Sequence, residues 1–390
     1  MEMSERLPAD RAASLSADRV APPERREEGA YRDHPAPTAN RLDWADVAKA
    51  ISILLVVLLH AVEELTYVEV EVGVVDEAMP VLGTMRMPLF FAASGIFAVR
   101  WVSTRTWRDL LNHKIALLVW VFLIWQPVVL AYKLAEMAWL PNQPDNSVTG
   151  QLAKFVAAPI RPNGELWFLW ALAVFFVVSK LLWTLPTWFK VGVPAMVSAL
   201  WFAFADDVIP SSVLRAGGDG LSGVCAYFFF FIAAAAFAAQ IKSGFSNLRW
   251  YLAVSIVAAW VGVEVVLQFV EVSFVGLSVL VRILAVAAGF AAATMLVRFR
   301  PLAWLGANTL QVYVGHMVLI VVAVLAIHAT GLDTSDWAWI LIPAVFAWGV
   351  LGSLVLHRAA LRAPGGRYLY KQPPWFRLRA RESVRYSPPG

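Results

Sequence analysis

The sequence predicts an all-α fold: a polytopic transmembrane helical bundle of about ten spans with both termini in the cytoplasm. Hydrophobic residues make up 59% of the chain and charged residues only 15%, whereas a soluble domain is nearer about one half apolar and one quarter charged. Apolar runs of about 18–25 residues recur along the chain, long enough to cross a bilayer as helices. The runs are continuous rather than alternating, so we do not expect an outer-membrane barrel.

The chain divides into three predicted regions. Residues 1–40 are rich in charge, Pro and Ala and poor in large apolar side chains, as expected of a disordered cytoplasmic tail. Residues 41–357 hold the membrane domain, and residues 358–390 are basic and rich in Pro, which predicts a second cytoplasmic tail. The predicted spans are 45–65, 78–99, 114–134, 165–183, 191–206, 221–241, 250–270, 274–297, 304–328 and 337–357.

The distribution of Lys and Arg predicts the orientation, because cytoplasmic loops carry an excess of both. With the N-terminus in the cytoplasm, the loops after the even-numbered spans are cytoplasmic, and they hold most of the basic residues. These are Arg100, Arg105, Arg108, Lys114, Lys180, Lys190, Lys242, Arg249, Arg298 and Arg300. The opposite loops hold only Lys133, Lys154, Arg161 and Arg215. Both termini are therefore expected inside, at the cell (inner or plasma) membrane.

Composition also argues against several kinds of site. Cys225 is the one cysteine, so an intrachain disulfide and a Cys-based zinc site are excluded, and a packing role is expected for it. The sequence contains no HExxH motif, no Walker-type phosphate loop and no GxSxG, and no metal is predicted. The net charge of +4 follows from basic cytoplasmic loops and needs no nucleic acid partner.

The first span carries polar groups that a bare anchor does not need. Ten residues separate Lys49 from His60, and eleven helical steps end about 20° past three full turns, so both lie on one face, ~16 Å apart along the axis. Asp46 is spaced to pair with Lys49. Glu63 and Glu64 lie three and four residues after His60, and either could accept a hydrogen bond from its ring and fix its tautomer.

Other ionisable residues fall inside predicted spans, where each is costly. Arg86 is expected at the depth of His60, and His316 lies roughly mid-span. Glu264 and Arg282 are at similar depth on neighbouring helices, where a structural ion pair is the simpler interpretation. Arg100 and Lys114 belong to a basic cytoplasmic loop that either sets topology alone or binds an anionic cytosolic ligand.

Four stretches resemble, in order, the acyltransferase 3 family of integral membrane O-acyltransferases. The first, "RLDWADVAKAISILLVVLLHA", is similar to the first span of that family, in which ten residues separate a basic residue from a His. The others are "RMPLFFAASGIF" (86–97), "GELWFLWALAVFF" (164–176) and "LGANTLQVYVGHMVLI" (305–320). The resemblance spans residue 41 to about residue 357. It departs from the family at "LLNHKIALLVW", where many members carry a pair of Arg and this chain has Lys114, with His113.

The resemblance implies transfer of an acyl group, usually acetyl, from cytosolic acyl-coenzyme A to a hydroxyl of an extracytoplasmic sugar, polysaccharide or glycolipid. It implies His60 as the catalytic His, with Arg86, Glu63, Glu64 and His316 around it. Lys49, Lys114 and Arg100 would face the coenzyme. His60 would act as general base or as transient acyl carrier, and the two stay open. A multispan transporter of an envelope solute is the alternative function.

Overall fold

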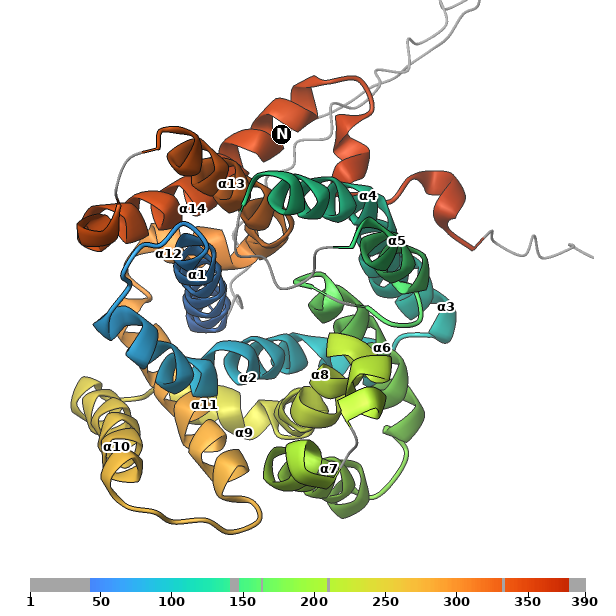
Figure 1. Cartoon of the computed structure of the whole chain (residues 1–390). Coiled ribbons are helices and arrows are strands. Elements are labelled where there is room, and N and C mark those ends of the chain that lie inside the picture. Colours follow the sequence, from blue (N-terminus) through green and yellow to red (C-terminus); the bar gives the residue numbers. More distant parts are fainter. Residues whose placement is uncertain (1–42, 141–146, 163, 209–210, 332–333, 379–390) are drawn as a thin grey trace, which may run out of the picture. The chain divides into compact units, whose positions relative to one another are not determined.

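A computed structural model describes residues 43–140, 147–162, 164–208, 211–331 and 334–378 (Figure 1). The predicted N-terminal tail, residues 1–40, lies outside the described residues. Within them the chain is helical throughout, and nine helices are long and apolar enough to cross a membrane. The shorter apolar helix α6 (Trp167–Leu182) occupies the remaining predicted span. The prediction of a polytopic helical bundle of about ten spans is confirmed, while the orientation of the termini stays a prediction.

The nine long spans follow the predicted runs, with shifted ends. Two adjoining short helices, α9 (Ala238–Ser246) and α12 (Arg300–Ala307), fall partly inside predicted spans, so the sixth span ends earlier and the ninth begins later than expected. The helices that contain the spans are α1 (Asp43–Thr66), α2 (Val74–Ser103), α3 (Trp107–Leu110) continuing through η1 (Leu111–Ile115) into α4 (Ala116–Trp139), α7 (Thr187–Val208), α8 (Ser211–Ala236), α10 (Trp250–Phe269), α11 (Leu277–Leu296), α13 (Thr309–Ala329) and α14 (Ala338–Arg362).

Helix α1 is the centre of the packing. It contacts α2, α11, α12, α13 and α14, and Figure 1 shows it surrounded by these helices. In its most apolar stretch 61% of residues are buried, against 17% in α10 and 22% in α7. Apolar side chains left exposed on a membrane helix face lipid without cost. The burial therefore makes α1 an interior helix and α7 and α10 lipid-facing helices, and an interior helix can hold a polar face.

Small residues bring the helices close. On α2, a Cβ added at Gly95 would stand 2.2 Å from the carbonyl oxygen of Phe231 on α8. On α12, a Cβ at Gly306 would stand 1.7 Å from the carbonyl oxygen of Asp46 on α1. Membrane helices associate through such close backbone contacts because lipid supplies no hydrophobic drive between them. Glycine is thus required by packing at both places.

The segment after α14 differs from a simple tail. Residues 363–378 lie inside the predicted C-terminal tail, yet they pack on the third span. The indole nitrogens of Trp120 and Trp125 donate to the carbonyls of Tyr368 (2.6 Å) and Leu369 (2.8 Å). Asn112 exchanges two hydrogen bonds with the backbone of Leu378, at 2.7 and 3.2 Å. We call residues 363–378 the C-terminal strap. The rest of the predicted tail, 379–390, lies outside the described residues.

The strap buries an aromatic side chain. Tyr370 lies edge-on to the ring of His357 and near Trp125, with ring centroids 4.4 and 5.8 Å away. Burial raises the pKa of its phenol to about 12. Within the described residues its hydroxyl has no hydrogen-bond partner, so the side chain contributes packing rather than polar bonding.

Candidate active site

Two histidines from distant parts of the chain meet between α1 and α13. The rings of His60 and His316 have centroids 5.4 Å apart, inclined by 32°. They are 256 residues apart in sequence, and the packing of α1 on α13 brings them together. His60 retains 21% exposure of its side chain, whereas His316 is fully buried. A substrate can therefore reach His60 more readily than His316.

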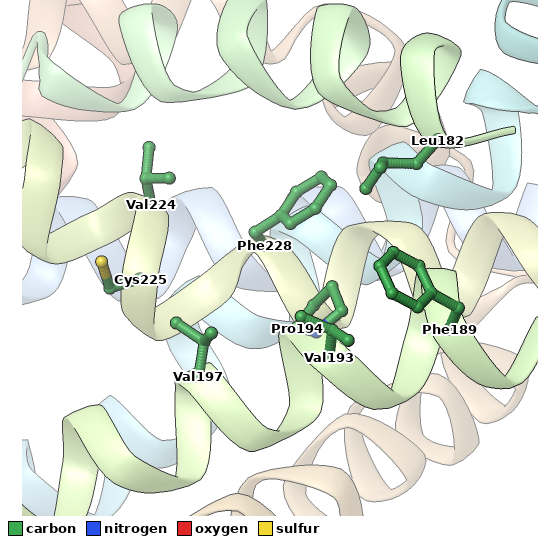
Figure 2. Close-up of a pocket in the computed structure, with 8 residues that line it drawn as sticks. All are labelled: Leu182, Phe189, Val193, Pro194, Val197, Val224, Cys225 and Phe228. Atoms are coloured by element: carbon green, nitrogen blue, oxygen red, sulfur yellow. The ribbon is translucent and has the colours of Figure 1, made fainter. Parts of the chain in front are cut away.

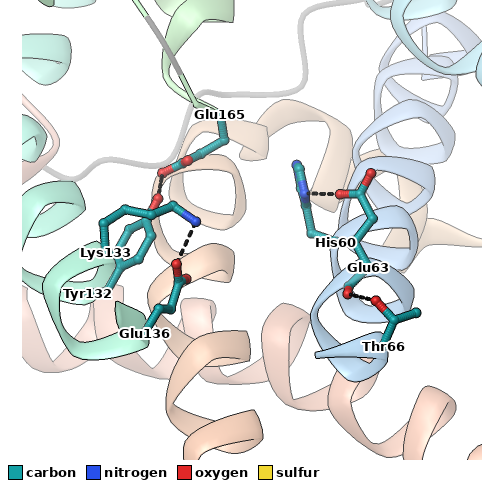
Figure 3. A network of polar contacts seen from close by, with 7 residues as sticks. All are labelled: His60, Glu63, Thr66, Tyr132, Lys133, Glu136 and Glu165. Carbon is teal, nitrogen blue, oxygen red and sulfur yellow. Dashed lines mark hydrogen bonds and ion pairs between the residues drawn. The ribbon is translucent and has the colours of Figure 1, made fainter. Parts of the chain in front are cut away.

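Glu63 fixes the His60 ring. Its Oε2 lies 3.0 Å from Nδ1 of His60, one helical turn away (Figure 3). An ionised carboxylate can only accept, so Nδ1 carries the proton and Nε2 keeps its lone pair. Of the two expected partners for His60, the structure has Glu63 and not Glu64. The pair has the geometry of a base held in one tautomer by a carboxylate.

His316 is held in a matching way by its own helix. Its Nδ1 lies 3.1 Å from the carbonyl oxygen of Val312 and donates to it, which leaves Nε2 as an acceptor. That Nε2 is buried and has no hydrogen-bond partner in the part of the chain that the structure describes. Because Nδ1 bonds back to the α13 backbone, Nε2 on the other edge of the ring is directed away from it.

Arg86 lies on α2, within electrostatic range of Glu63 and of the Tyr227 phenol. The hydroxyl of Ser52 on α1 donates to the backbone carbonyl of Arg86 and ties the two helices together. Ser52 precedes His60 by eight residues, so this bond lies about 12 Å from His60 along the axis rather than level with it. Among the described residues the buried Nη1 of Arg86 has no hydrogen-bond partner, which makes the guanidinium a cation with an unused donor.

Glu64 belongs to a second group of charges facing α4. Its carboxylate is 3% exposed and acts electrostatically with Glu136, Lys133 and Glu165. Lys133 Nζ lies 2.6 Å from Glu136 Oε2, and the Tyr132 hydroxyl donates to Glu165 Oε1 at 2.5 Å (Figure 3). Just past the end of α1, burial and the Glu64 carboxylate raise the pKa of the Tyr67 phenol.

The sequence alone does not predict that Lys133 and Glu136 lie in the site. Lys133 and Glu136 have the i, i+3 spacing of a helical ion pair at the end of a span, which was a usable signal. Their proximity to Glu64 depends on how α4 lies relative to α1, and no local pattern encodes that. The polar site therefore includes more residues than those predicted from the first span.

The other end of α1 holds two lysines. Lys49 pairs with Asp46 at 2.7 Å and lies over the Phe97 ring at 4.6 Å. Lys114, on the π-helical turn η1, lies 5.0 Å over the Trp101 ring and within electrostatic range of Lys49. Arg100 is exposed, and its backbone carbonyl accepts hydrogen bonds from Thr104 and Arg105. The structure thus brings Lys49 and Lys114 together and leaves Arg100 at the edge.

Glu264 and Arg282 do not form the expected ion pair, although both lie within the described residues. Glu264 accepts from the Thr84 hydroxyl at 2.6 Å and from the Trp260 indole at 3.1 Å. Arg282 donates to the Ser278 carbonyl at 3.0 Å and lies 3.8 Å over the Phe202 ring. Two neutral donors thus bind Glu264, while a carbonyl acceptor and a ring face contact Arg282. The two charges still act on each other electrostatically.

A cavity of about 210 Å³ lies elsewhere, between α6, α7 and α8 (Figure 2). Its lining is apolar apart from one thiol: Leu182, Phe189, Val193, Pro194, Val197, Val224, Cys225 and Phe228. Such a lining offers no base and no charge for group transfer, so the polar region between α1, α2, α4 and α13 is the candidate active site.

Comparison with known proteins agrees with a membrane acyltransferase. A family model described as an acyltransferase domain matches residues 42–358. The inner membrane protein YcfT of Escherichia coli (strain K12) is 26% identical over 153 residues, a match that covers 35% of this chain and 43% of that protein. The chain therefore aligns with less than half the length of that relative. No solved structure matches.

Proposed function

Because this chain belongs to the acyltransferase 3 family, we propose that it moves an acyl group, acetyl in the simplest case, from acyl-coenzyme A to a hydroxyl of a sugar, polysaccharide or glycolipid. Membership in an acyltransferase family favours this function over the transporter alternative. The proposed location is the inner or plasma membrane, in keeping with the name of the relative YcfT.

The observation that carries the proposal is the His60–Glu63 pair, in which the Nε2 of His60 keeps its lone pair, with Arg86 within electrostatic range of Glu63. Acyl transfer to an alcohol needs a base for the hydroxyl proton and a donor where the carbonyl oxygen gains charge. His60 supplies the first and the guanidinium of Arg86 the second. Glu63 stabilises the imidazolium that forms when Nε2 takes the proton.

The reaction balances with these groups alone. Nε2 of His60 takes the acceptor's proton as its oxygen attacks the thioester carbonyl. The carbon–sulfur bond then breaks, and the departing thiolate takes the proton from His60. In a two-step version Nε2 attacks the thioester carbon, and the carbon–sulfur bond breaks to release the thiolate. The hydroxyl oxygen then attacks the acyl carbon, the carbon–nitrogen bond breaks, and the hydroxyl proton passes to the thiolate.

Lys49 and Lys114 are the proposed contacts for the donor's phosphates. They lie near each other at one end of α1, and Lys is a common phosphate ligand. Lys49 and His60 are ~16 Å apart along the helix axis, the separation that the extended arm of the coenzyme must bridge. Arg100, exposed at the end of α2, is a peripheral contact at most.

The test uses a deletion strain. Wild type and His60→Ala are expressed at equal membrane abundance, and O-acyl groups on envelope glycans and lipids are measured after mild base release. Wild type should restore the acyl esters, and His60→Ala should leave them at the deletion level. Full restoration by His60→Ala would remove His60 from the mechanism. If the deletion changes no O-acyl ester but blocks export of a solute, the result would favour the transporter alternative.

A further inference from the structure

Lys133 lies among acidic side chains from three elements. Three carboxylates, those of Glu64, Glu136 and Glu165, come from α1, α4 and the turn before α6. Lys133 is the cation among them, 2.6 Å from Glu136. Tyr132 adds one hydroxyl, which donates to Glu165. We call these five residues the carboxylate cluster.

Two acceptors of the cluster have no donor. Among the described residues, Glu64 Oε2 and Glu136 Oε1 are buried without a hydrogen-bond partner, and the two residues are only 3% and 0% exposed. An unmet buried acceptor costs roughly 1–3 kcal/mol, more when charged. Glu136 also acts electrostatically on Glu64. A ligand that hydrogen-bonds to both side chains would lower this cost.

A third unmet acceptor borders the same region from α13. His316 Nε2, fully buried, is an acceptor directed away from its own helix. The next residue, Met317, packs against Tyr132 of the cluster, and the Tyr313 hydroxyl donates to the backbone carbonyl of Glu165. The histidine is thus linked to the cluster through two neighbours. Figure 3 shows the His60 side chain and the Lys133 ammonium directed toward each other from α1 and α4.

The chemistry of these atoms selects the ligand class. A buried glutamate accepts through both oxygens when it is ionised and donates one hydrogen bond when it is protonated, and the His316 Nε2 accepts, so the ligand must present groups that can both donate and accept. Neutral hydroxyl groups meet this requirement and add no charge beside Lys133. Sugars carry adjacent hydroxyls at fixed spacing, and each can donate one hydrogen bond and accept another.

We propose that the carboxylate cluster is a hydroxyl-binding subsite for a polyhydroxylated acceptor, which holds the hydroxyls next to the one that reacts at His60. Glu64 and Glu136 accept from these neighbouring hydroxyls, and Lys133 donates to an oxygen of the same sugar. The proposal rests on the proposed function, because the subsite positions the acceptor for acyl transfer. In this role the cluster residues are positioning residues and take no proton from the reacting hydroxyl.

The experiment uses the full chain in lipid nanodiscs. The acceptor probe is the deacylated envelope polysaccharide extracted from the deletion strain, and the donor is radiolabelled acetyl-coenzyme A. Steady-state rates are compared for wild type, Glu64→Gln, Glu136→Gln and the control Glu71→Gln, an exposed acid just beyond α1. Binding of the polysaccharide without donor is measured in parallel by tryptophan fluorescence.

We expect both cluster variants to raise the KM for the polysaccharide at least tenfold, to weaken its donor-free binding by a similar factor, and to leave the KM for acetyl-coenzyme A within twofold. The control should match wild type. Glu64→Gln loses no bond at Oε2, so it keeps the test valid if Glu136→Gln unfolds after losing Lys133.

Opposite results overturn the subsite. An unchanged KM for the polysaccharide in folded variants, or equal losses for donor and acceptor, would contradict it while the acyl transfer of the wild type stands. Failure of the wild type to bind the polysaccharide would also contradict it. If the wild type binds the polysaccharide through the cluster but transfers no acyl group, the subsite stands and the proposed function fails.

Discussion

Glu63 and Glu64 are adjacent in sequence, but their side chains interact with different groups. Both are within one turn of His60, and helix geometry allows either to reach its ring. The structure pairs Glu63 with His60 at 3.0 Å and buries Glu64 against the charges of α4. The sequence could therefore predict a carboxylate partner for His60 but not which one, because that depends on the direction from which α4 approaches α1.

The first residue-scale prediction concerns Glu63. In Glu63→Ala, His60 loses the group that holds Nδ1 protonated and stabilises the imidazolium. We expect kcat for acyl transfer to fall on the order of 10-fold, less than the 10²–10⁴-fold typical of losing the base itself, since Glu63 is half exposed. Rates of purified protein in nanodiscs measure this, with Glu71→Ala as control. A variant with the kcat of wild type would show that Glu63 does not support His60.

At the scale of elements, α2 and α8 are joined through a glycine. Gly95 falls in one of the stretches that resemble the family, yet its role here is packing, because its backbone meets the Phe231 carbonyl of α8. The resemblance included Gly95 but did not show that the residue packs against α8. Helix contacts across the bundle arise from side-chain shapes in three dimensions, so periodicity along one helix could not predict this pair.

The prediction at Gly95 is a loss of stability. Gly95→Val should force α2 and α8 apart and lower stability by about 1–3 kcal/mol or more, as overpacking does. The midpoint of thermal unfolding in detergent should fall accordingly. Gly262→Val on α10 is the matched control, because a Cβ there meets nothing within 4 Å. Equal midpoints for both variants would contradict the close contact.

The packing of the C-terminal strap could not be predicted from its composition. Its Pro and basic residues predicted a tail, whereas two Trp donors on α4 and the Asn112 side chain on η1 bind its backbone. Every residue has a backbone carbonyl, so the sequence of the strap does not show which of its carbonyls accept hydrogen bonds. This is why the membrane spans were predictable and the packing of the strap was not.

Removing one donor should loosen the strap. Trp125→Phe keeps a ring but leaves the Leu369 carbonyl without its 2.8 Å partner, at a cost of roughly 1–3 kcal/mol. Limited trypsin digestion should then cleave faster after Lys371 and Arg377. Trp375→Phe is the control, since Trp375 is 75% exposed. If both variants resist trypsin as wild type does, the Trp125 bond does not hold the strap.

At the scale of the whole molecule, the interior position of α1 explains how polar groups survive in an apolar chain. The lipid-facing helices α7 and α10 expose apolar side chains, and the charges gather along the buried helix and its neighbours. The sequence predicted the bundle, the shared face of Lys49 and His60, and a role for His316. It could not predict that Lys133 and Glu136 complete the polar region, because that requires the arrangement of all the spans.

Orientation is the whole-molecule prediction. In a Cys225→Ala background, Val148→Cys on α5 (Val148–Ala157) should react with a membrane-impermeant maleimide on intact cells, because its loop is predicted to be external. Asn247→Cys, exposed between α9 and α10, should react only after the cells are opened. The reverse pattern would place His60 on the cytoplasmic half and contradict transfer toward an outer acceptor.

The central claim is that His60 performs acyl transfer from acyl-coenzyme A. Its most direct test is the transfer of radiolabelled acetyl from acetyl-coenzyme A to deacylated envelope polysaccharide by the purified chain in nanodiscs, for wild type and His60→Ala at equal concentration. The account predicts transfer by wild type and a fall of at least about 10²-fold in the variant, with thermal stability retained. Equal transfer by both proteins would contradict it.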